Sequence, residues 1–519
     1  MNQTIRRSVT AALAACIVIP GTASATNGYF AHGIGTKSKA MAGVATALPQ
    51  DSLVSATNPA GMAFVGNRLD LGVAFFSPSD RGYQADGNFA TGTYPPPDSF
   101  PVPTGGFVTP GEYNSDKDWF FIPSFGYNRE LDSKSSIGVS VFGNGGMNTE
   151  YKDRAVFENF ALAPNQRVLK SPQGDLPQFD TSSGRPTPIT NDDIAYVPGY
   201  GVVPAAPSGI LPCGSSGANP EACTVNANPG GFLTASTPTG VNLEQLFIEI
   251  PYTMKLGDGT QSFGIAPVFA VQSFEAKGLQ PFQAASVDPT KVTNNGKDWT
   301  YGFGLHFGWM GEVNEQLSLG LSYRTKIWMT DIDEYSGLFA NGGEFDIPAK
   351  FNFGLAYKAR PDLTLAFDYE HIFYNEIDAL ANSNDLDLSP CFGAAPKPSF
   401  CLGGDAGLGF GWESMDIVKL GVRWDQSDQW KFFGGVSYNT DFLKSSRQAL
   451  FNILAPATVR WHLTLGATYV HSPKDEFNLS FAYMPKETVD GTSPDITGAQ
   501  TGSIYMEQKD IELSWSHHF

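Results

Sequence analysis

The sequence predicts an all-β protein, a transmembrane antiparallel β-barrel of about fourteen strands with an N-terminal hatch, or plug, inside its lumen. Three observations predict this fold class. Apolar residues alternate with small or polar residues in many segments after residue 66. Short and long connections between these segments follow one another without exception. Residues 26–66, ahead of the first alternating segment, are rich in Gly and Ala and lack a period of two.

The composition agrees with such a barrel and excludes other classes. The 519 residues include 56 Gly, 38 Phe and 19 Tyr, and aromatic residues together with Gly favour strands joined by tight turns. The formal net charge is -19. Because phosphate contacts require a surplus of Lys and Arg, we expect no nucleic-acid partner. No later stretch has ~18 uninterrupted apolar residues, so no helical membrane span is expected.

Residues 1–25 have the pattern of a secretory signal peptide. Arg6 and Arg7 supply the positive region, and residues 11–19 supply the apolar region. Ala23-Ser24-Ala25 provides a small-x-small cleavage site. The mature chain would therefore begin at the next residue, in an exported protein.

Five cysteines are present, and the first lies in a motif that resembles a lipobox, Leu13-Ala14-Ala15-Cys16. The apolar run continues beyond Cys16, which favours ordinary signal cleavage over lipidation. The other four form two pairs of equal spacing, Cys213 with Cys223 and Cys391 with Cys401. An exported chain enters an oxidising compartment, so two local disulfides are expected. No His lies near either pair in sequence, so a metal site is not expected.

The alternating segments are typical of strands with one apolar face. In the clearest segment, residues 299–309, one face is apolar and the other is small or polar. A single such strand would also fit a soluble sheet, because period two shows only that one side is apolar. Repetition favours a wall between lipid and lumen. The same alternation begins near residues 69, 137, 317, 351, 363, 418, 461, 477 and 511, and the last segment ends on Phe519.

The connections between the expected strands are of two kinds. Outer-membrane barrels have short periplasmic turns and long external loops, whereas a sandwich or a propeller gives no reason for strict alternation. Both cysteine pairs fall in long connections, where a disulfide can clamp a loop with little core of its own. The short connections are residues 131–134, 257–260, 311–315, 359–362, 425–428 and 471–475. The long ones are residues 78–116, 148–242, 278–297, 331–342, 379–411, 441–456 and 489–502.

Several stretches resemble the FadL-type family of outer-membrane transporters, which carry long-chain fatty acids or hydrocarbons. Gly28-Tyr29-Phe30, residues 33–43 and the motif Asn58-Pro59-Ala60-Gly61 resemble the start of that family. Residues 137–147 resemble its third strand, and the resemblance extends to Phe519. It implies a monomeric barrel of about fourteen strands in the outer membrane of a Gram-negative bacterium.

The resemblance also implies a division of the chain and a function. Residues 1–25 would be the signal peptide, residues 26–66 the hatch, and residues 67–519 the barrel with its long extracellular loops. The loops would capture a long-chain fatty acid or another hydrophobic molecule and pass it to a site at the hatch. The ligand would then leave sideways into the membrane by passive diffusion. Outer-membrane lipid and lipopolysaccharide are the other expected partners, and no cofactor is expected.

The lateral exit would be a kink in the third strand at Asn144, Gly145 and Gly146. These residues break the alternation, and Gly within a strand marks a bulge or bend. Freed backbone groups in a barrel wall are tolerated only where they line a wet or protein-covered opening. The alternative is that the glycines simply begin the long connection at residues 148–242.

The expected ligand-binding residues are Tyr29 and Phe30 in the hatch and Arg324 and Arg423 on inferred interior faces. Charges in a wet lumen are often simply solvated. Family members that carry fatty acids place basic residues near the ligand carboxylate, but residues 407–412, where one such lysine would align, contain none. Uptake of neutral aromatic or alkane hydrocarbons by the same route is therefore the alternative.

An enzyme is not expected. No Gly-x-Ser-x-Gly motif is present, and Gly435-Val436-Ser437-Tyr438-Asn439 stops short of one. His306, His371 and His462 are scattered singly, and no metal site is indicated. An outer-membrane hydrolase is thus a weaker alternative. An adhesin would give the hatch no role, and a general aqueous porin would conduct ions better than a plugged barrel.

Overall fold

The computed structural model describes residues 27–86, 91–93, 101–103, 108–152, 156–157, 179–180, 185–186, 195–197, 201–203, 238–384, 391, 397–443, 449–492 and 500–519. The expected signal peptide, with its lipobox-like Cys16, lies outside these residues. So does the cysteine pair expected between Cys213 and Cys223.

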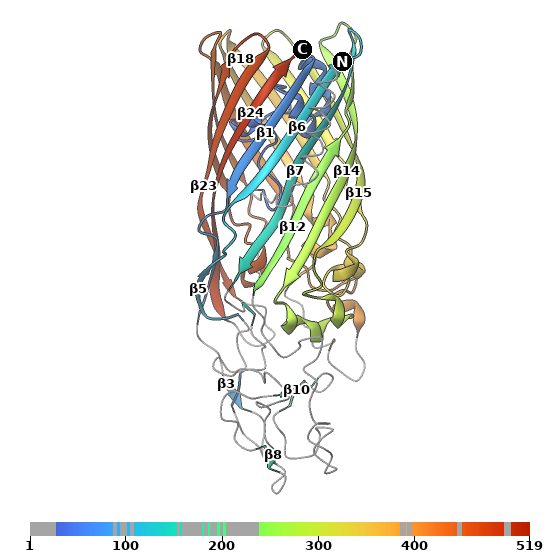
Figure 1. Cartoon of the computed structure of the whole chain (residues 1–519), viewed down its shortest axis with the longest axis vertical. Helices are drawn as coiled ribbons and strands as arrows, with labels where there is room; N and C mark the ends of the chain where they lie inside the picture. Colours follow the sequence, from blue (N-terminus) through green and yellow to red (C-terminus); the bar gives the residue numbers. More distant parts are fainter. Residues whose placement is uncertain are drawn as a thin grey trace, which may run out of the picture.

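The wall is a closed antiparallel barrel of 14 strands, which confirms the predicted fold class (Figure 1). It closes because β1 (Arg68–Ser77) pairs with β6 (Phe120–Glu130) on one side and with β24 (Thr501–His518) on the other. The other wall strands pair in chain order. They are β7 (Ser135–Tyr151), β12 (Thr239–Glu249) continued by β13 (Tyr252–Leu256), β14 (Gln261–Lys277), β15 (Asp298–Glu312), β16 (Leu317–Arg324), β18 (Lys350–Arg360), β19 (Leu363–Ile372), β20 (Met415–Asp425), β21 (Trp430–Asn439), β22 (Trp461–Val470) and β23 (Asp475–Thr492).

Shorter elements lie at the ends of the wall or between its strands. β2 (Gly82–Ala85), β5 (Gly111–Asn114) and β17 (Trp328–Met329) extend the wall sheet. Three separate pairs are β3 (Thr91–Thr93) with β4 (Pro101–Pro103), β8 (Phe179–Asp180) with β9 (Arg185–Pro186), and β10 (Ala195–Val197) with β11 (Gly201–Val203). The short helices are α2 (Thr36–Lys39), η1 (Ser52–Ala56), η2 (Pro59–Phe64), η4 (Gln280–Ala285), η5 (Pro289–Lys291), η6 (Asp333–Tyr335), α3 (Ala340–Gly343), η7 (Tyr374–Glu376), α4 (Asp378–Ala381), η9 (Pro398–Phe400) and η10 (Ala449–Leu454).

The connections follow the predicted order. The short turns gather at the upper end of the barrel in Figure 1, together with the C-terminus, and the described parts of the long connections, such as η4 and η5, lie at the lower end. Several boundaries differ from the prediction, among them the end of β23, which reaches Thr492 inside the connection expected at 489–502. β7 and β12 each extend four residues into the connection expected at 148–242. β16 ends at Arg324, before the connection expected at 331–342, because the Thr325 hydroxyl replaces a backbone acceptor and takes the Leu305 N–H at 3.0 Å.

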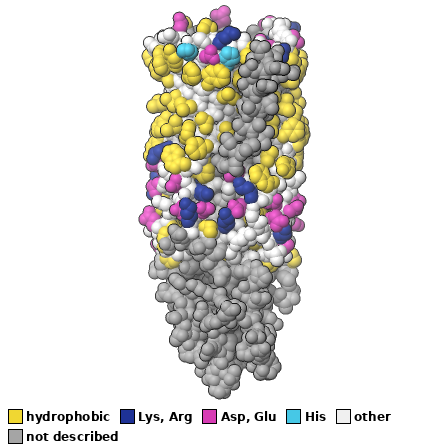
Figure 2. All heavy atoms as spheres, viewed as in Figure 1, with side chains coloured by type: hydrophobic (Ala, Val, Ile, Leu, Met, Phe, Trp, Pro, Cys, Tyr) yellow, Lys and Arg dark blue, Asp and Glu magenta, His cyan; other side chains and the backbone are white. Residues whose placement is uncertain are grey.

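The outer surface of the wall is apolar over one band. Figure 2 shows hydrophobic side chains gathered on the barrel, with a belt of mixed Lys, Arg, Asp and Glu below them and charged residues again at the upper rim. Outward aromatic side chains are exposed, such as Trp299 at 48% and Trp461 at 48%. Inward residues on the same strands, such as His306 and His462, are fully buried. Since exposed apolar side chains are stable only in lipid, the band is the surface that spans the membrane.

Residues 27–66, which we call the N-terminal segment, lie inside the barrel and are nearly all buried (blue in Figure 1). The wall makes room for them with glycines on its inner face. A Cβ on Gly264 would lie 2.5 Å from the Ala60 nitrogen, which is too close for any other residue type. The small residues of the alternating strands therefore match the shape of the segment. This glycine face consists of Gly264, Gly308, Gly320, Gly354, Gly421, Gly435 and Gly466.

Candidate functional site

The hydrogen-bonded ladder between β6 and β7 stops part-way along the wall. Its last pair is Phe125 with Val141, although both strands continue beyond it. Beyond this pair β6 is joined only to β1, and it contains Pro123, which has no N–H to donate to a ladder. The stretch before β6 and the far end of β7 are joined again, where the Asp116 N–H donates to the Glu150 carbonyl at 2.7 Å. We call the gap between these two junctions the wall opening.

The edge of β7 along the wall opening carries a β-bulge. Gln245 of β12 lies opposite Gly145, and Leu246 lies opposite Gly143, so Asn144 is the extra residue. The bulge lies well inside β7. The glycines therefore do not begin the long connection, which was the alternative interpretation.

The N-terminal segment pairs with this bulge. The Ala31 N–H donates to the Asn144 carbonyl at 2.9 Å, and the Gly146 N–H donates to the Tyr29 carbonyl at 2.9 Å. A Cβ on Gly145 would overlap that same carbonyl oxygen, so only glycine lets the two backbones approach. The segment thus satisfies backbone groups of β7 that the interrupted ladder leaves without a strand partner.

Aromatic rings surround the N-terminal segment next to the bulge. The fully buried Tyr29 has ring-centroid distances of 5.0 Å to Phe30, 5.5 Å to Tyr374 and 6.1 Å to Trp412. These rings come from the segment, from η7 and from the stretch before β20. We call these four residues and Arg324 the inner site. Such rings can pack against an apolar ligand with faces or edges.

Arg324 ends β16 and is 1% exposed. Its guanidinium carbon lies 5.2 Å from the ring centroid of Phe30 and 4.8 Å from that of Phe247. Nη1 donates to the Asn144 Oδ1 atom at 3.3 Å, which links the arginine to the bulge. Nε and Nη2 are buried without a hydrogen-bond partner, and no carboxylate in the described ranges forms an ion pair with this residue. A buried guanidinium with two free donors can bind an anionic group.

The structure does not bring Arg423 to this site. Its Nε and Nη2 atoms each donate to Asp425 at 2.8 Å, near the short turn that follows β20. It lines a separate cavity of about 250 Å³ with Lys431 and His518. The other three residues predicted to bind ligand, Tyr29, Phe30 and Arg324, do meet. Both arginines lie near the C-terminal ends of their strands, but β16 and β20 run in opposite directions along the wall, so the two side chains lie toward opposite ends of the barrel.

The motif at residues 58–61 begins η2 and ties the N-terminal segment to the wall. The Asn58 Oδ1 atom accepts the Ala60 N–H at 3.1 Å and so caps this short helix. Its Nδ2 atom donates to the carbonyl oxygens of Thr46 at 2.7 Å and Trp309 at 3.1 Å. The residues named for the hatch motif are therefore structural in this arrangement and lie away from the inner site.

Buried ion pairs also hold the N-terminal segment in place. The Lys39 Nζ atom lies 2.7 Å from Asp510 and 2.9 Å from Glu512, both on β24, and its side chain is 5% exposed. Lys37 pairs with Glu476 of β23. Removing one partner of a buried pair typically costs about 3–5 kcal/mol, because the other charge is left uncompensated. The segment is thus held most firmly at β23 and β24, away from the bulge on β7.

A narrow apolar cavity of about 50 Å³ lies among the external loops. Phe157, Phe282 and Leu402 line it with other apolar residues. The ring of Phe157 is 5.0 Å from that of Phe282. Nearby, burial raises the pKa of Tyr335 to about 12, so its hydroxyl stays protonated and donates to the Gly296 carbonyl at 2.7 Å. We call this space the outer cavity.

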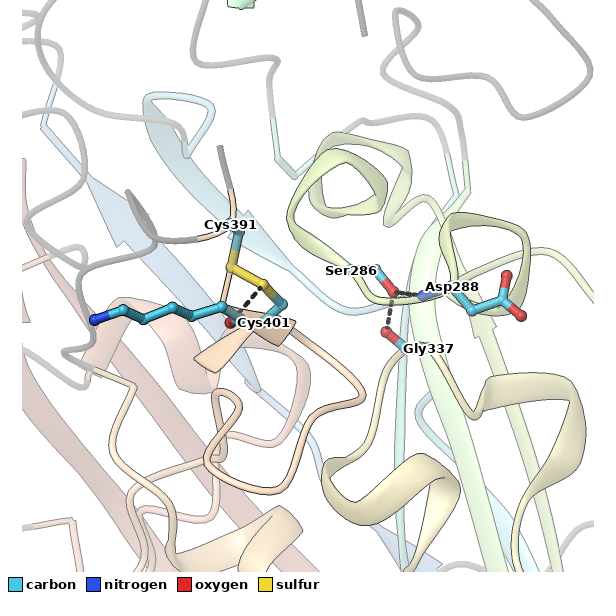
Figure 3. Close-up of a disulfide and its surroundings, with 6 residues drawn as sticks. Ser286, Asp288, Gly337, Cys391 and Cys401 are labelled. Atoms are coloured by element: carbon cyan, nitrogen blue, oxygen red, sulfur yellow. Dashed lines mark hydrogen bonds between the residues drawn. A yellow bond between two sulfur atoms is a disulfide. The ribbon is translucent and has the colours of Figure 1, made fainter. Parts of the chain in front are cut away.

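A disulfide between Cys391 and Cys401 braces the loop beside the outer cavity, as the cysteine spacing predicts (Figure 3). The next residue, Leu402, forms a parallel bridge with Ser286 and lines the cavity. The Ser286 hydroxyl in turn donates to the Gly337 carbonyl at 2.6 Å. The disulfide therefore fixes one wall of the cavity to two neighbouring loops.

Within the described ranges, no group of three or more His, Cys, Asp or Glu residues could hold a metal ion. No described helix is both long and apolar enough to cross a membrane. The sequence interpretation missed Phe247, Tyr374 and Trp412 at the inner site. Nothing in the local sequence marks them, because they reach Tyr29 or Arg324 only through the barrel closure.

An exterior apolar band, an occluded lumen and an aromatic interior site define an outer-membrane transport barrel. Residues 270–510 match the model of the family described as outer membrane protein transport protein (OMPP1/FadL/TodX). This match confirms the resemblance to that family drawn from the sequence, and it agrees with a location in the outer membrane.

Solved structures show the same fold at low sequence identity. The Pseudomonas putida toluene transporter TodX has a TM-score of 0.56 and 15% identity, over 94% of this chain and 99% of that chain. A Pseudomonas aeruginosa FadL homologue has a TM-score of 0.56 and 14% identity, over 95% and 100%. The Ralstonia pickettii toluene transporter TbuX has a TM-score of 0.50 and 12% identity, over 94% and 99%. Among curated proteins, none matches the chain significantly.

Proposed function

We propose that this transporter takes up hydrophobic molecules through its external loops and releases them sideways into the membrane through the wall opening. One observation carries the proposal. The ladder between β6 and β7 is interrupted inside the apolar band, and the N-terminal segment, not a wall strand, pairs with the freed edge at the bulge. A short backbone segment can withdraw more easily than a wall strand, because the two backbone hydrogen bonds seen between it and the bulge in the described part of the chain are far fewer than those of a full strand ladder.

The proposed route to the wall opening passes two sites. The outer cavity offers an apolar surface for capture from water, worth roughly 25 cal/mol for each Å² of apolar area buried. The inner site offers aromatic rings and a guanidinium. Between them, the Tyr151 hydroxyl reaches the Ile453 carbonyl at 3.5 Å and the Thr149 hydroxyl donates to the Leu454 carbonyl at 2.8 Å. Because Leu454 also lines the outer cavity, the outer cavity and the inner site are adjacent along β7.

The side chains that flank the wall opening on the β6 side are apolar and can contact an apolar solute. Trp119 and Phe121 on the β6 side are 62% and 54% exposed on the outer surface. Phe120 and Ile122, which alternate with them, are buried on the inner side. A molecule that passes between β6 and β7 would therefore meet apolar side chains on both faces of the wall, and it would cross no charged ring.

Deleting Asn144 tests the route. The deletion removes the extra residue, so Gly143 and Gly145 become consecutive partners of Leu246 and Gln245 and the strand is straightened. We expect uptake of a radiolabelled substrate by whole cells to fall to the level of cells without the transporter. The matched control is Asn144→Ala, which keeps the bulge and should keep most of the uptake. Equal uptake by the deletion variant and the wild type would contradict lateral release.

For the substrate, we propose an amphipathic molecule with a carboxylate, such as a long-chain fatty acid. The free Nε and Nη2 atoms of Arg324 support this choice, because a carboxylate can accept both. A neutral aromatic hydrocarbon is the second candidate. It is favoured by the density of rings around Tyr29 and by the absence of any carboxylate-binding lysine at residues 407–412.

Replacing Arg324 with glutamine separates the two candidates. If a carboxylate binds there, the affinity for dodecanoate should fall about 10- to 100-fold, the range that a hydrogen bond to a charged group supports. The affinity for toluene should change little. Titration calorimetry on the purified protein measures both. Arg324→Lys, which keeps the charge but not the fork of donors, should give an intermediate affinity for dodecanoate. Equal losses for both ligands would favour a merely structural role.

A further inference from the structure

A second buried arginine, Arg81, also lacks a carboxylate partner. It follows β1 and immediately precedes β2, and it is 6% exposed. Its Nη2 atom donates to two neutral acceptors, the Ser115 hydroxyl at 3.2 Å and the Lys117 carbonyl at 2.9 Å. Its Nε atom is buried without a hydrogen-bond partner. In a chain with 52 Asp and Glu against 33 Lys and Arg, a buried cation with no acidic partner in the described ranges is unusual.

The acidic residues nearby are engaged elsewhere or remote. The Glu150 carboxylate lies 3.8 Å from the Lys117 ammonium group. Asp118 influences Arg81 only through space and forms no ion pair with it. Burial lowers the pKa of the Arg81 guanidinium to about 10, so the group is still protonated at neutral pH. Burying a charge without a partner costs several kcal/mol. Within the described ranges, Arg81 is such a buried cation, with hydrogen bonds to neutral acceptors but no ion pair.

Arg81 lies where the wall opening ends. The Ser115 hydroxyl that it contacts accepts the Glu150 N–H at 3.0 Å, at the edge of β7. The Arg81 carbonyl itself accepts the Ser115 N–H at 2.8 Å. These bonds are part of the outer junction that joins the β6 side to β7. The guanidinium is therefore built into the outer margin of the wall opening.

Arg81 shares the inner side of the wall with aromatic residues. It alternates with Tyr83, which is fully buried, whereas Gln84 on the other face is exposed. The Tyr83 ring lies 5.4 Å from that of Tyr151, whose hydroxyl points toward η10 beside the outer cavity. The guanidinium thus faces the route between the outer cavity and the inner site, not the lipid. This placement argues against the phosphate of a membrane lipid as its partner.

We propose that Arg81 is a second anion site of the transport route, which receives the carboxylate of a single-chain amphiphile while its hydrocarbon tail lies in the wall opening. The inference rests on the proposed function. A carboxylate would replace the Ser115 and Lys117 acceptors, use the free Nε donor and neutralise the buried charge. Arg324 and Arg81 would then bind the head group in turn, at the inner and the outer end of the opening.

The test compares acid and alcohol of equal chain length. Dodecanoate and dodecanol are titrated into the purified full-length mature protein, and acetate serves as an anion without a tail. The variants are R324Q, which removes the inner arginine, and R324Q combined with R81Q or R81K. We expect R324Q alone to prefer dodecanoate over dodecanol by about 10-fold, and the combination with R81Q to lose that preference. The combination with R81K should keep part of it.

An unchanged preference for the acid when R81Q is added would overturn the inference. Full displacement of dodecanoate by acetate at equal concentration would also overturn it, because the site would then take free small anions. If the wild type binds neither dodecanoate nor dodecanol, the proposed function itself fails. Where R81Q does not fold, Arg81→Met gives the same readout, since an apolar residue of similar length removes the buried charge without adding a polar group.

Discussion

Replacing Lys39 with methionine is expected to loosen the N-terminal segment and to raise the ion conductance of the barrel. The change leaves Asp510 and Glu512 buried side by side on β24 without the ammonium group that contacts both. Losing one partner of a buried ion pair costs about 3–5 kcal/mol. The equilibrium between a docked and an undocked segment should therefore shift by about 100-fold or more toward the undocked form. Single-channel recording in planar bilayers measures the open time directly.

The control variant removes the two buried negative charges together with the positive charge of Lys39. In the triple variant K39M/D510N/E512Q no buried charge is left unpaired, so conductance should return toward the wild-type level. A variant of Lys117, which pairs with Glu150 at 3.8 Å and is 43% exposed, should leave conductance unchanged because exposed pairs contribute little. If K39M is as closed as the wild type, the ion pairs do not hold the segment.

Replacing Gly145 with alanine is expected to displace the N-terminal segment from the wall opening. The added Cβ would overlap the Tyr29 carbonyl oxygen, and a backbone atom cannot move aside as a flexible side chain can. The segment should withdraw, lose the Gly146-to-Tyr29 hydrogen bond and move Phe30 away from Arg324. We expect at least a 10-fold loss of affinity for a hydrophobic ligand at the inner site, since removing contacts worth about 1.4 kcal/mol gives that factor. Hydrogen exchange at residues 27–31 should become faster.

The matched control is Gly434→Ala. Gly434 also lies in a wall strand, but nothing comes closer than 3.5 Å to a Cβ built there. Binding and hydrogen exchange should stay at wild-type values in this variant. Equal behaviour of the two alanine variants would mean that the bulge does not depend on the close approach of the segment.

The strands of the wall could be predicted from sequence because the environment of each residue, lipid or lumen, alternates along the strand itself. Lipid on one side and packed polar groups or glycine on the other impose a period of two, so strands such as residues 299–309 are visible directly. The strict alternation of short and long connections then favoured a barrel over a sandwich or a propeller. The early end of β16 was not predictable, since it depends on the Thr325 hydroxyl meeting the Leu305 backbone across the sheet.

The site could be predicted only in part. Tyr29 and Phe30 stand in a recognisable N-terminal stretch, and Arg324 could be placed on an inner face by alternation. Alternation does not give depth, so Arg423 was assigned to the same site although it pairs with Asp425 near a turn. Arg81 gave no signal at all. Arg81 is notable because no acidic side chain in the described ranges forms an ion pair with it, and only the folded barrel shows which side chains lie close to it.

The glycine face limits which N-terminal segments this barrel can accept. Each glycine in it marks a place where the backbone or a side chain of the N-terminal segment touches the wall, as Gly264 does with Ala60 and Gly435 with Met41. The contacts are spread over strands from β14 to β22, so no single strand carries the match. A chimera that takes its first 66 residues from a relative must therefore take the small-residue positions of the wall as well. A change of shape in the N-terminal segment therefore requires matching changes in the glycine face of the wall.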